Sequence, residues 1–575
     1  MLLVALAVIA GRLTYIQVVQ AQALSATAAR QRLRDLTLSP RRGSIFDREG
    51  QPLAVTTDAK SIYAVPSQVK DATATASTLA QVLGGDAASY LKRLTRKGSF
   101  SYIARKVDLL RAAQLEKLGI DGIGFIADSR RTYPSGTLAG QVLGCVGVDD
   151  AGLAGIEMQY DSTLAGTAGR IIAERDPKGH LIPGSIVEST DPIDGQDIFL
   201  TIDKDIQNQA EIELARAVEQ FHAKGGTVVV MDPNNGEILA TASTPFLDPN
   251  AYGTAIAESK RVKAITDAYE PGSTMKAMTA AAVIDKGLYT PASVLHLPST
   301  LDIGGITVHE SHARGAVDYT LSQIVTKSSN VGAVKLGQAL GRKTLAEYVD
   351  RFRLGQRTGV DFPGESAGMT PPLSKWTNST MGNLPFGQGI SVTPLQLARA
   401  VAAIANGGSL VTPHFLSRQG SLPATFPASP EPVITRATAT ATTRMLTDVV
   451  RDGTGTEAAV GQYEVAGKTG TAQKARPGGL GYMKGAYVSS FVGYLPASAP
   501  RVLILVTIDS PTKSIYGGTV AAPAFSHLAR FCVDHLKIAP AASVGPVVVN
   551  KAASSQDGNE AASDSLETTR IAGSD

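Results

Sequence analysis

Cysteine is nearly absent from this chain of 575 residues, which contains only Cys145 and Cys532. Small disulfide-stapled domains and structural zinc sites need clusters of cysteines, so the sequence excludes both classes. The two cysteines are far apart in sequence and fall in different predicted domains, so we expect no disulfide between them.

The sequence also lacks an excess of charge of either sign. It has 54 basic and 51 acidic residues, a net charge of +3, with no dense basic segment. Proteins that bind the phosphate backbone of nucleic acids concentrate lysine and arginine on one face, so nucleic acid is not an expected partner. A length of 575 residues exceeds what one core usually organises, which predicts at least two domains.

A long uninterrupted apolar run is missing as well. Residues 2–10 are apolar, but nine residues make about 14 Å of helix against a hydrocarbon core of roughly 30 Å. A cleaved signal peptide is the alternative, yet neither a basic leading segment nor a small-residue cleavage site is present. We therefore predict a membrane anchor over residues 1–20, and we expect its full span to need residues before Met1.

Residues 21–195 consist of short apolar runs interrupted by turns, such as 61–66 and 140–148. This pattern predicts a mostly β domain, with a helical insertion near residues 71–120. Its charged turns offer no evident pair of nucleophile and base, so we expect this domain to be a supporting pedestal.

The pattern changes near residue 196. A helix is predicted by apolar residues that share one face: Ile206, Ala210, Leu214, Ala217 and Phe221. An Asn-Gly turn separates two strand-like runs within 227–242, and two further strand-like runs, 487–496 and 502–508, precede a helix near 523–537. Strands at both ends of the segment and helices between them predict an α+β domain over residues 196–540, built on an antiparallel sheet. Residues 541–575 are rich in alanine, serine and acids, which predicts a disordered tail.

Three short motifs stand out in the second domain: Ser273-Thr-Met-Lys276, Ser328-Ser-Asn330 and Lys468-Thr-Gly470. Each motif alone is common, and a second Ser-x-x-Lys occurs at Ser510-Pro-Thr-Lys513. A single match is most often a helix-surface serine beside a solvated lysine. The order and the context of the three motifs carry the argument.

Ser273 follows a Glu-Pro-Gly turn and precedes an apolar helical run, so it should lie at the start of a buried helix. Lys276, three residues on, projects from the same face and can reach the serine hydroxyl. A desolvated lysine can be neutral enough to take the hydroxyl proton, and the positive end of the helix further disfavours the protonated amine. Ser273 is thus the predicted nucleophile and Lys276 its base.

The other two motifs supply groups that such a pair needs. Ser328 can relay protons, and Asn330 offers an amide that orients a substrate peptide group. Lys468 can hold the site positive, which lowers the pKa of Lys276, and can attract a carboxylate. Gly470 would let a substrate approach the strand backbone closely.

In this order and context the motifs resemble those of the penicillin-recognising serine enzymes. Further segments are similar to class B penicillin-binding proteins along residues 13 to about 537: 42–50, 131–136, 152–157, 270–276, 386–396 and 468–473. The resemblance implies a single-pass anchor, a non-catalytic pedestal and a C-terminal transpeptidase domain with helices on both faces of its sheet and a helical subdomain. Residues 491–496 and the compact pedestal resemble the division-specific, septal branch.

The resemblance also implies a role for each motif residue. Ser273 would be acylated by the penultimate D-Ala of a stem peptide, with Lys276 as general base and Ser328 as proton shuttle. The substrate-binding residues would be Asn330, Lys468, Thr469, Gly470 and Thr471. The backbone N–H groups of Ser273 and Thr471 would form the oxyanion hole, and an amine of a second stem peptide would then attack the acyl-enzyme.

No cofactor or metal is implied for this acyl transfer. His309 and His312 lack a third ligand and are expected to be solvated loop residues. The implied partners are the D-Ala-D-Ala donor and diamino-acid acceptor peptides, β-lactams as covalent inhibitors, a glycosyltransferase and other division proteins. The implied location is the cytoplasmic membrane, with the catalytic domain on its outer, periplasmic or extracellular, side.

Other functions are less consistent with the sequence. A serine β-lactamase would need a glutamate that activates water, and the nearest candidate, Glu365, lacks the expected neighbours. An antibiotic sensor would need a signalling domain, which we do not recognise, and an inactive scaffold would be expected to lose one of the three motifs. An elongation-type transpeptidase of the same family remains an alternative to the septal one.

Overall fold

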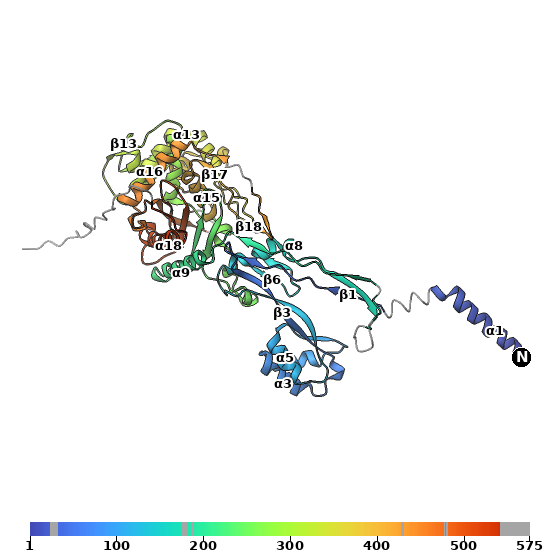
Figure 1. Ribbon diagram of the computed structural model, residues 1–575. Helices are drawn as coiled ribbons and strands as arrows, with labels where there is room; N and C mark the ends of the chain where they lie inside the picture. Colours follow the sequence, from blue (N-terminus) through green and yellow to red (C-terminus); the bar gives the residue numbers. More distant parts are fainter. Residues whose placement is uncertain are drawn as a thin grey trace, which may run out of the picture.

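The computed structural model describes residues 1–22, 33–174, 182, 184–186, 188–426, 431–476, 478 and 481–540. The predicted disordered tail, residues 541–575, lies outside the described residues. Figure 1 shows an elongated pedestal that leads into a C-terminal domain of helices and strands, with β3 running from that domain to a group of helices that includes α3 and α5.

The N-terminal helix is longer than the apolar run predicts. Helix α1 (Leu2–Thr14) continues into a π-helical turn, η1 (Tyr15–Val19), and none of its side chains is buried against the protein. Leu2–Val19 is an 18-residue helical segment of mean hydropathy 2.0, long and apolar enough to cross a membrane. At 1.5 Å per residue it measures about 27 Å. The apolar run therefore underestimates the length of helix available to cross a membrane, because the few polar residues after Ala10 do not end the helix.

The pedestal is built around one long strand, β3 (Pro52–Ala64). It pairs antiparallel with β5 (Ile123–Thr132) and with β4 (Ser101–Asp108). The predicted insertion near residues 71–120 contains β4 and three helices: α3 (Ala72–Leu83), α4 (Ala87–Leu94) and α5 (Leu109–Lys117). An aspartate side chain caps the N-terminus of each helix by accepting backbone N–H bonds, which fixes where each helix begins.

A second sheet of the pedestal joins β1 (Leu33–Leu38), β8 (Gly169–Glu174) and β9 (Glu188–Thr190), all antiparallel. The main sheet extends from β3 through β2 (Ile45–Phe46) and β10 (Ile198–Leu200) to β18 (Leu416–Gln419) and β19 (Leu422–Pro423). Since β18 and β19 come from the C-terminal half of the chain, a single sheet links the pedestal to the following domain.

Residues 140–148 were expected to contribute strand to this module, and this prediction was largely wrong. The segment begins with a short helix, α6 (Gly140–Leu143), and only two of its residues form a strand, β6 (Cys145–Val146), which pairs with β7 (Gly152–Ala154). Gly144 has φ +73°, and a Cβ there would lie 2.0 Å from the Ala154 carbonyl oxygen. The glycine permits a tight turn that apolar periodicity does not reveal.

A buried ionic network holds the pedestal segments together. The Glu157 carboxylate, 0% exposed, accepts hydrogen bonds from Arg42 Nε (2.8 Å) and Arg131 Nε (2.6 Å). Tyr133 OH donates to the same carboxylate, and Arg42 also pairs with Asp161. An unpaired buried charge raises the free energy of the folded state. Loss of any one of these side chains should therefore destabilise the pedestal, because it leaves the remaining charges without a partner.

The C-terminal domain contains a five-stranded antiparallel sheet in the order β12 (Ile238–Ser243), β11 (Gly225–Met231), β23 (Val502–Asp509), β22 (Tyr482–Leu495), β21 (Ala466–Ala475). Its strands come from the two ends of the domain sequence, as predicted. β21 lies at one edge of this sheet, so one side of its backbone has no neighbouring strand there.

Helices cover both faces of this sheet. Side chains of β23 alternate between two cores: Ile504 and Val506 pack with α9 (Lys204–Gln220) and α18 (Ala522–His535), whereas Leu503 and Leu505 face the opposite core. The opposite core contains α11 (Met275–Asp285), α15 (Pro394–Ala405) and α16 (Arg436–Asp452). Helix α9 is the helix that the apolar pattern after residue 196 predicts. All five residues that were expected to share its apolar face are buried in the core between α9, α18 and the sheet. Helices α12 (Leu321–Thr326), α13 (Asn330–Arg351) and α14 (Asn378–Asn383) add a helical region beside the sheet.

Candidate active site

Ser273 lies in a 3-10 turn, η5 (Gly272–Thr274), that leads directly into α11. Gly272 has φ +56°, and its N–H bonds to the Gly387 carbonyl at 3.0 Å. Thr274 Oγ1 donates to the Pro271 carbonyl at 2.7 Å. The predicted position at the start of a buried helix thus agrees with the structure, except that the serine precedes the α-helix proper.

The three sequence motifs meet at the hydroxyl of Ser328. Lys276 Nζ lies 3.2 Å from Ser328 Oγ. Lys468, which lies on strand β21, places its Nζ 3.0 Å from the same Ser328 oxygen. Lys276 Nζ also donates to the Ser328 carbonyl (2.5 Å) and to Asn330 Oδ1 (2.7 Å). Ser328 therefore connects two lysines that are 192 residues apart in sequence (468 − 276).

Both lysines are almost completely buried, each 1% exposed. Burial lowers the pKa of Lys276 well below its usual value, and the charge of Lys468 lowers it further, whereas Glu310 raises it. Burial also lowers the pKa of Lys468 to about 7. The main cause of the lowered Lys276 pKa is thus desolvation, with Lys468 second, and both favour the neutral form of the amine, which can accept a proton.

No hydrogen bond joins the Ser273 hydroxyl to Lys276 in the described part of the chain. The amine instead contacts three oxygens, two of Ser328 and one of Asn330. A neutral amine has two N–H donors and one lone pair, so deprotonation frees a lone pair that can accept a proton from the Ser328 hydroxyl or from the predicted nucleophile. This lone pair is the group that Ser273 would need if it acts as the predicted nucleophile.

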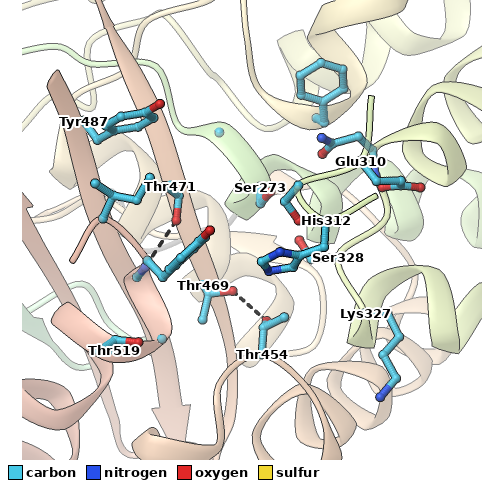
Figure 2. A pocket seen from close by; sticks show the side chains of 18 of the residues that line it. Ser273, Glu310, His312, Lys327, Ser328, Thr454, Thr469, Thr471, Tyr487 and Thr519 are labelled. Atoms are coloured by element: carbon cyan, nitrogen blue, oxygen red, sulfur yellow. Dashed lines mark hydrogen bonds between the residues drawn. The ribbon is translucent and has the colours of Figure 1, made fainter. Parts of the chain in front are cut away.

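A cavity of about 870 Å³ opens over these residues. Figure 2 shows Ser273 and Ser328 facing it, with Thr469 and Thr471 on one side and Glu310 and His312 on the other. The lining also includes Asn330, Lys327, Phe386, Gln388, Gln473 and Tyr487. Lys276 and Lys468 are not part of the lining, so they act on the cavity from behind it through Ser328.

The β21 side of the cavity is held by hydroxyl contacts. Thr469 Oγ1 lies 2.7 Å from Thr454 Oγ1, and Thr471 Oγ1 accepts the Gly517 N–H at 3.2 Å. Gly470 does not line the cavity. A Cβ at Gly470 would lie 2.3 Å from Ser490 Oγ, so packing between strands requires this glycine, and its role in the approach of a substrate stays a prediction.

Glu310 is the main residue that the sequence motifs missed. Its carboxylate accepts hydrogen bonds from Ser329 Oγ (2.5 Å) and from the Asn330 backbone N–H (2.7 Å), and it pairs with Arg314 (2.5 Å). No periodicity or motif marks it, and its place in the polar loop before Ser328 was the one available signal. Thr454, Tyr487 and Gly517 were missed for the same reason.

Of the remaining candidates, His309 and His312 line the active-site cavity, whereas Ser510, Glu365 and the two cysteines lie outside its lining. His309 and His312 are exposed, and the His312 ring lies 5.6 Å from that of Tyr516. Ser510 is buried and donates to its neighbour Asp509, away from the cavity lining. Glu365 accepts bonds from the backbone and hydroxyl of Thr358, and Cys145 and Cys532 are free and buried.

Family comparisons agree with this arrangement. Residues 226–530 match the penicillin binding protein transpeptidase domain, and residues 37–200 match the penicillin-binding protein dimerisation domain. The chain belongs to the class B penicillin-binding proteins. The predicted family and fold class are thereby confirmed, and Leu2–Val19 has the length and composition of a single-pass membrane anchor.

This penicillin-binding protein has relatives along almost its whole length. It is 35% identical over 546 residues to stage V sporulation protein D of Bacillus subtilis, covering 93% of this chain and 84% of that protein. It is 35% identical over 586 residues to PbpB of Mycobacterium tuberculosis (96% and 86% covered) and 34% identical over 550 residues to peptidoglycan D,D-transpeptidase FtsI of Escherichia coli (94% and 91%).

Solved structures of the family have the same fold. Penicillin binding protein 3 of Mycobacterium tuberculosis, complexed with aztreonam, matches with a TM-score of 0.71 and 31% identity over 90% of this chain and all of that one. Together with the transpeptidase domain and the named relatives, this shows that the penicillin-binding protein is a serine-type peptidoglycan D,D-transpeptidase. The predicted enzyme class is confirmed.

Proposed function

We propose that this transpeptidase cross-links stem peptides through an acyl-enzyme on Ser273, in septal cell-wall synthesis during division. The observation that carries the assignment of the site is the position of Ser328 Oγ, within 3.2 Å of both Lys276 Nζ and Lys468 Nζ. A hydroxyl between two buried amines can pass a proton in either direction, and Ser273 lies beside it on the cavity surface.

Acylation begins when neutral Lys276 takes the proton of Ser273 Oγ and the oxygen attacks the carbonyl carbon of the penultimate D-Ala. The backbone N–H groups of Ser273 and Thr471 stabilise the negative oxygen of the tetrahedral intermediate. The C–N bond then breaks, and the amine of the terminal D-Ala leaves with the proton, which returns from Lys276 through Ser328.

Transfer to the acceptor repeats these steps in reverse. The amine of a second stem peptide attacks the acyl carbon, its proton passes through Ser328 to Lys276 and back to Ser273 Oγ, and a new amide bond replaces the ester. Water competes poorly, because no carboxylate among the described lining residues is hydrogen-bonded to Ser273 or Lys276. We therefore expect a long-lived acyl-enzyme.

Substrate binding falls to the edge strand and to Asn330. An extended peptide can pair with the open side of β21, which places its carboxylate near Thr469 and Thr471. The buried Lys468 amine lies behind Ser328 and supplies positive charge to this side of the cavity. Asn330 Oδ1 is occupied by Lys276, and Nδ2 donates to the His309 carbonyl at 2.8 Å. One N–H of the Asn330 amide therefore remains to orient the peptide group of the substrate.

The role in division rests on the resemblance of residues 491–496 and of the compact pedestal to the septal branch of the family. The enzyme would face the outer side of the cytoplasmic membrane, where cross-linking takes place, and would act with a glycosyltransferase and other division proteins. Depletion in the source organism tests this role: cells should elongate without septa, and a fluorescent fusion should gather at division sites. Rounding of the cells with intact septation would instead indicate an elongation enzyme.

Intact-protein mass spectrometry after incubation with a penicillin tests the nucleophile. The wild type should gain one antibiotic mass on the peptide that carries Ser273 and keep it for minutes or longer, and Ser273→Ala should gain none. Ser510→Ala serves as the matched control, because it removes the serine of the second Ser-x-x-Lys and should be acylated normally. An adduct on another residue, or rapid hydrolysis of the antibiotic, would refute the assignment.

A further inference from the structure

Glu310 is a buried acid that the reaction steps above do not use. It lies between β15 (Ile306–His309) and β16 (Val317–Thr320), and its side chain is 7% exposed. Buried carboxylates persist where they are paired and hydrogen-bonded, and Glu310 has three such contacts, to Ser329, Asn330 and Arg314. Two of these contacts are to the Ser328-Ser329-Asn330 motif itself.

The contacts hold this motif in an unusual conformation. Ser328 has φ +57°, a left-handed backbone that is costly for a residue other than glycine. Ser329 Oγ donates to Glu310 and accepts the Gly332 N–H at 2.9 Å, so it also caps α13. With the residues after Ser328 fixed from both sides, its hydroxyl stays between the two lysines.

Glu310 also contributes a negative charge that acts on Lys276. Two charged groups act on Lys276: Lys468 from β21 and Glu310 from the loop, with the Glu310 charge partly offset by Arg314. Glu310 raises the pKa of Lys276, whereas burial and Lys468 lower it. The carboxylate thus works against the two effects that keep Lys276 neutral.

We propose that Glu310 is a positioning residue that locks the Ser328–Asn330 motif onto the Lys276 amine and sets the pH range in which Ser273 is acylated. The inference rests on the proposed acyl-enzyme on Ser273. Lys276 must be neutral to act as a base, so acylation rises as the pH rises through the pKa of Lys276. Removal of the Glu310 charge lowers that pKa, so the acidic limb of the pH profile should move to lower pH.

The test measures the second-order rate constant of acylation by a penicillin across pH for the full chain and its variants. Glu310→Gln should lower the plateau rate about 10-fold, because one acceptor for the motif is lost, and should shift the acidic limb to lower pH. Glu310→Asp keeps the charge and should slow acylation without that shift. Glu347→Gln, the same change at an exposed position of α13, should reproduce the wild-type profile.

Arg314→Gln gives a second readout of opposite sign. It leaves the Glu310 charge without its cation, so the acidic limb should move to higher pH, and this variant decides the question if Glu310→Gln does not fold. Limbs that stay at the wild-type pH in both variants, including a uniform loss of rate, would overturn the proposal. A wild type that forms no adduct on Ser273 would refute the proposed function instead, so the two failures are distinguishable.

Discussion

The shared contact of Lys276 and Ser328 makes a quantitative prediction about how their losses combine. Lys276→Met keeps an unbranched side chain in the same buried volume but removes the base, and should slow acylation by a penicillin about 10³-fold or more. That factor corresponds to about 4 kcal/mol of lost transition-state stabilisation. Ser328→Ala removes the oxygen that lies within 3.2 Å of both lysine amines, and should cost about 10²-fold.

The double variant is the informative one. If Ser328 acts through Lys276, the hydroxyl has no proton to relay once the amine is gone, so the double variant should be about as slow as Lys276→Met alone. Independent contributions would instead multiply to about 10⁵-fold. Stopped-flow acylation with a chromogenic β-lactam measures all three, and Lys286→Met, at the exposed C-terminal end of α11, is the control. A double variant whose acylation rate falls by the product of the two single losses would refute the proton relay through Ser328.

Three further outcomes follow from the structure. Gly470→Ala should lower both the thermal midpoint and the acylation rate, and Ser490→Gly should restore part of the loss, because a Cβ would meet Ser490 Oγ at 2.3 Å; no recovery would contradict this packing. Glu157→Gln should destabilise the pedestal by about 3–5 kcal/mol in chemical denaturation, since it leaves buried arginines uncompensated, whereas Asp452→Asn on the surface should change stability by less than about 1 kcal/mol. Removal of residues 545–575 should leave the melting temperature and penicillin acylation unchanged, because an acidic, alanine-rich segment buries too little surface to offset its ordering entropy; a drop of several degrees would contradict this.

Much of the C-terminal fold is local in origin and could be read from the sequence. The apolar face of α9 follows from the 3.6-residue period, and the β11–β12 hairpin from its Asn-Gly turn. Residues 140–148 show the limit of this approach. A short apolar run suits a strand or a buried helix equally, and a close contact between Gly144 and Ala154 decided between them.

The active site divides in the same way. The sequence determined the family and the motifs that mark it, and it predicted the nucleophile-base pair Ser273 and Lys276, because spacing along one helix and the order of motifs are local facts. The tertiary structure decided that Lys468 reaches the same hydroxyl as Lys276, and that Glu310 clamps the motif between them. These contacts join strand, loop and helix across large sequence separations, and their energetics depend on burial, which no motif encodes.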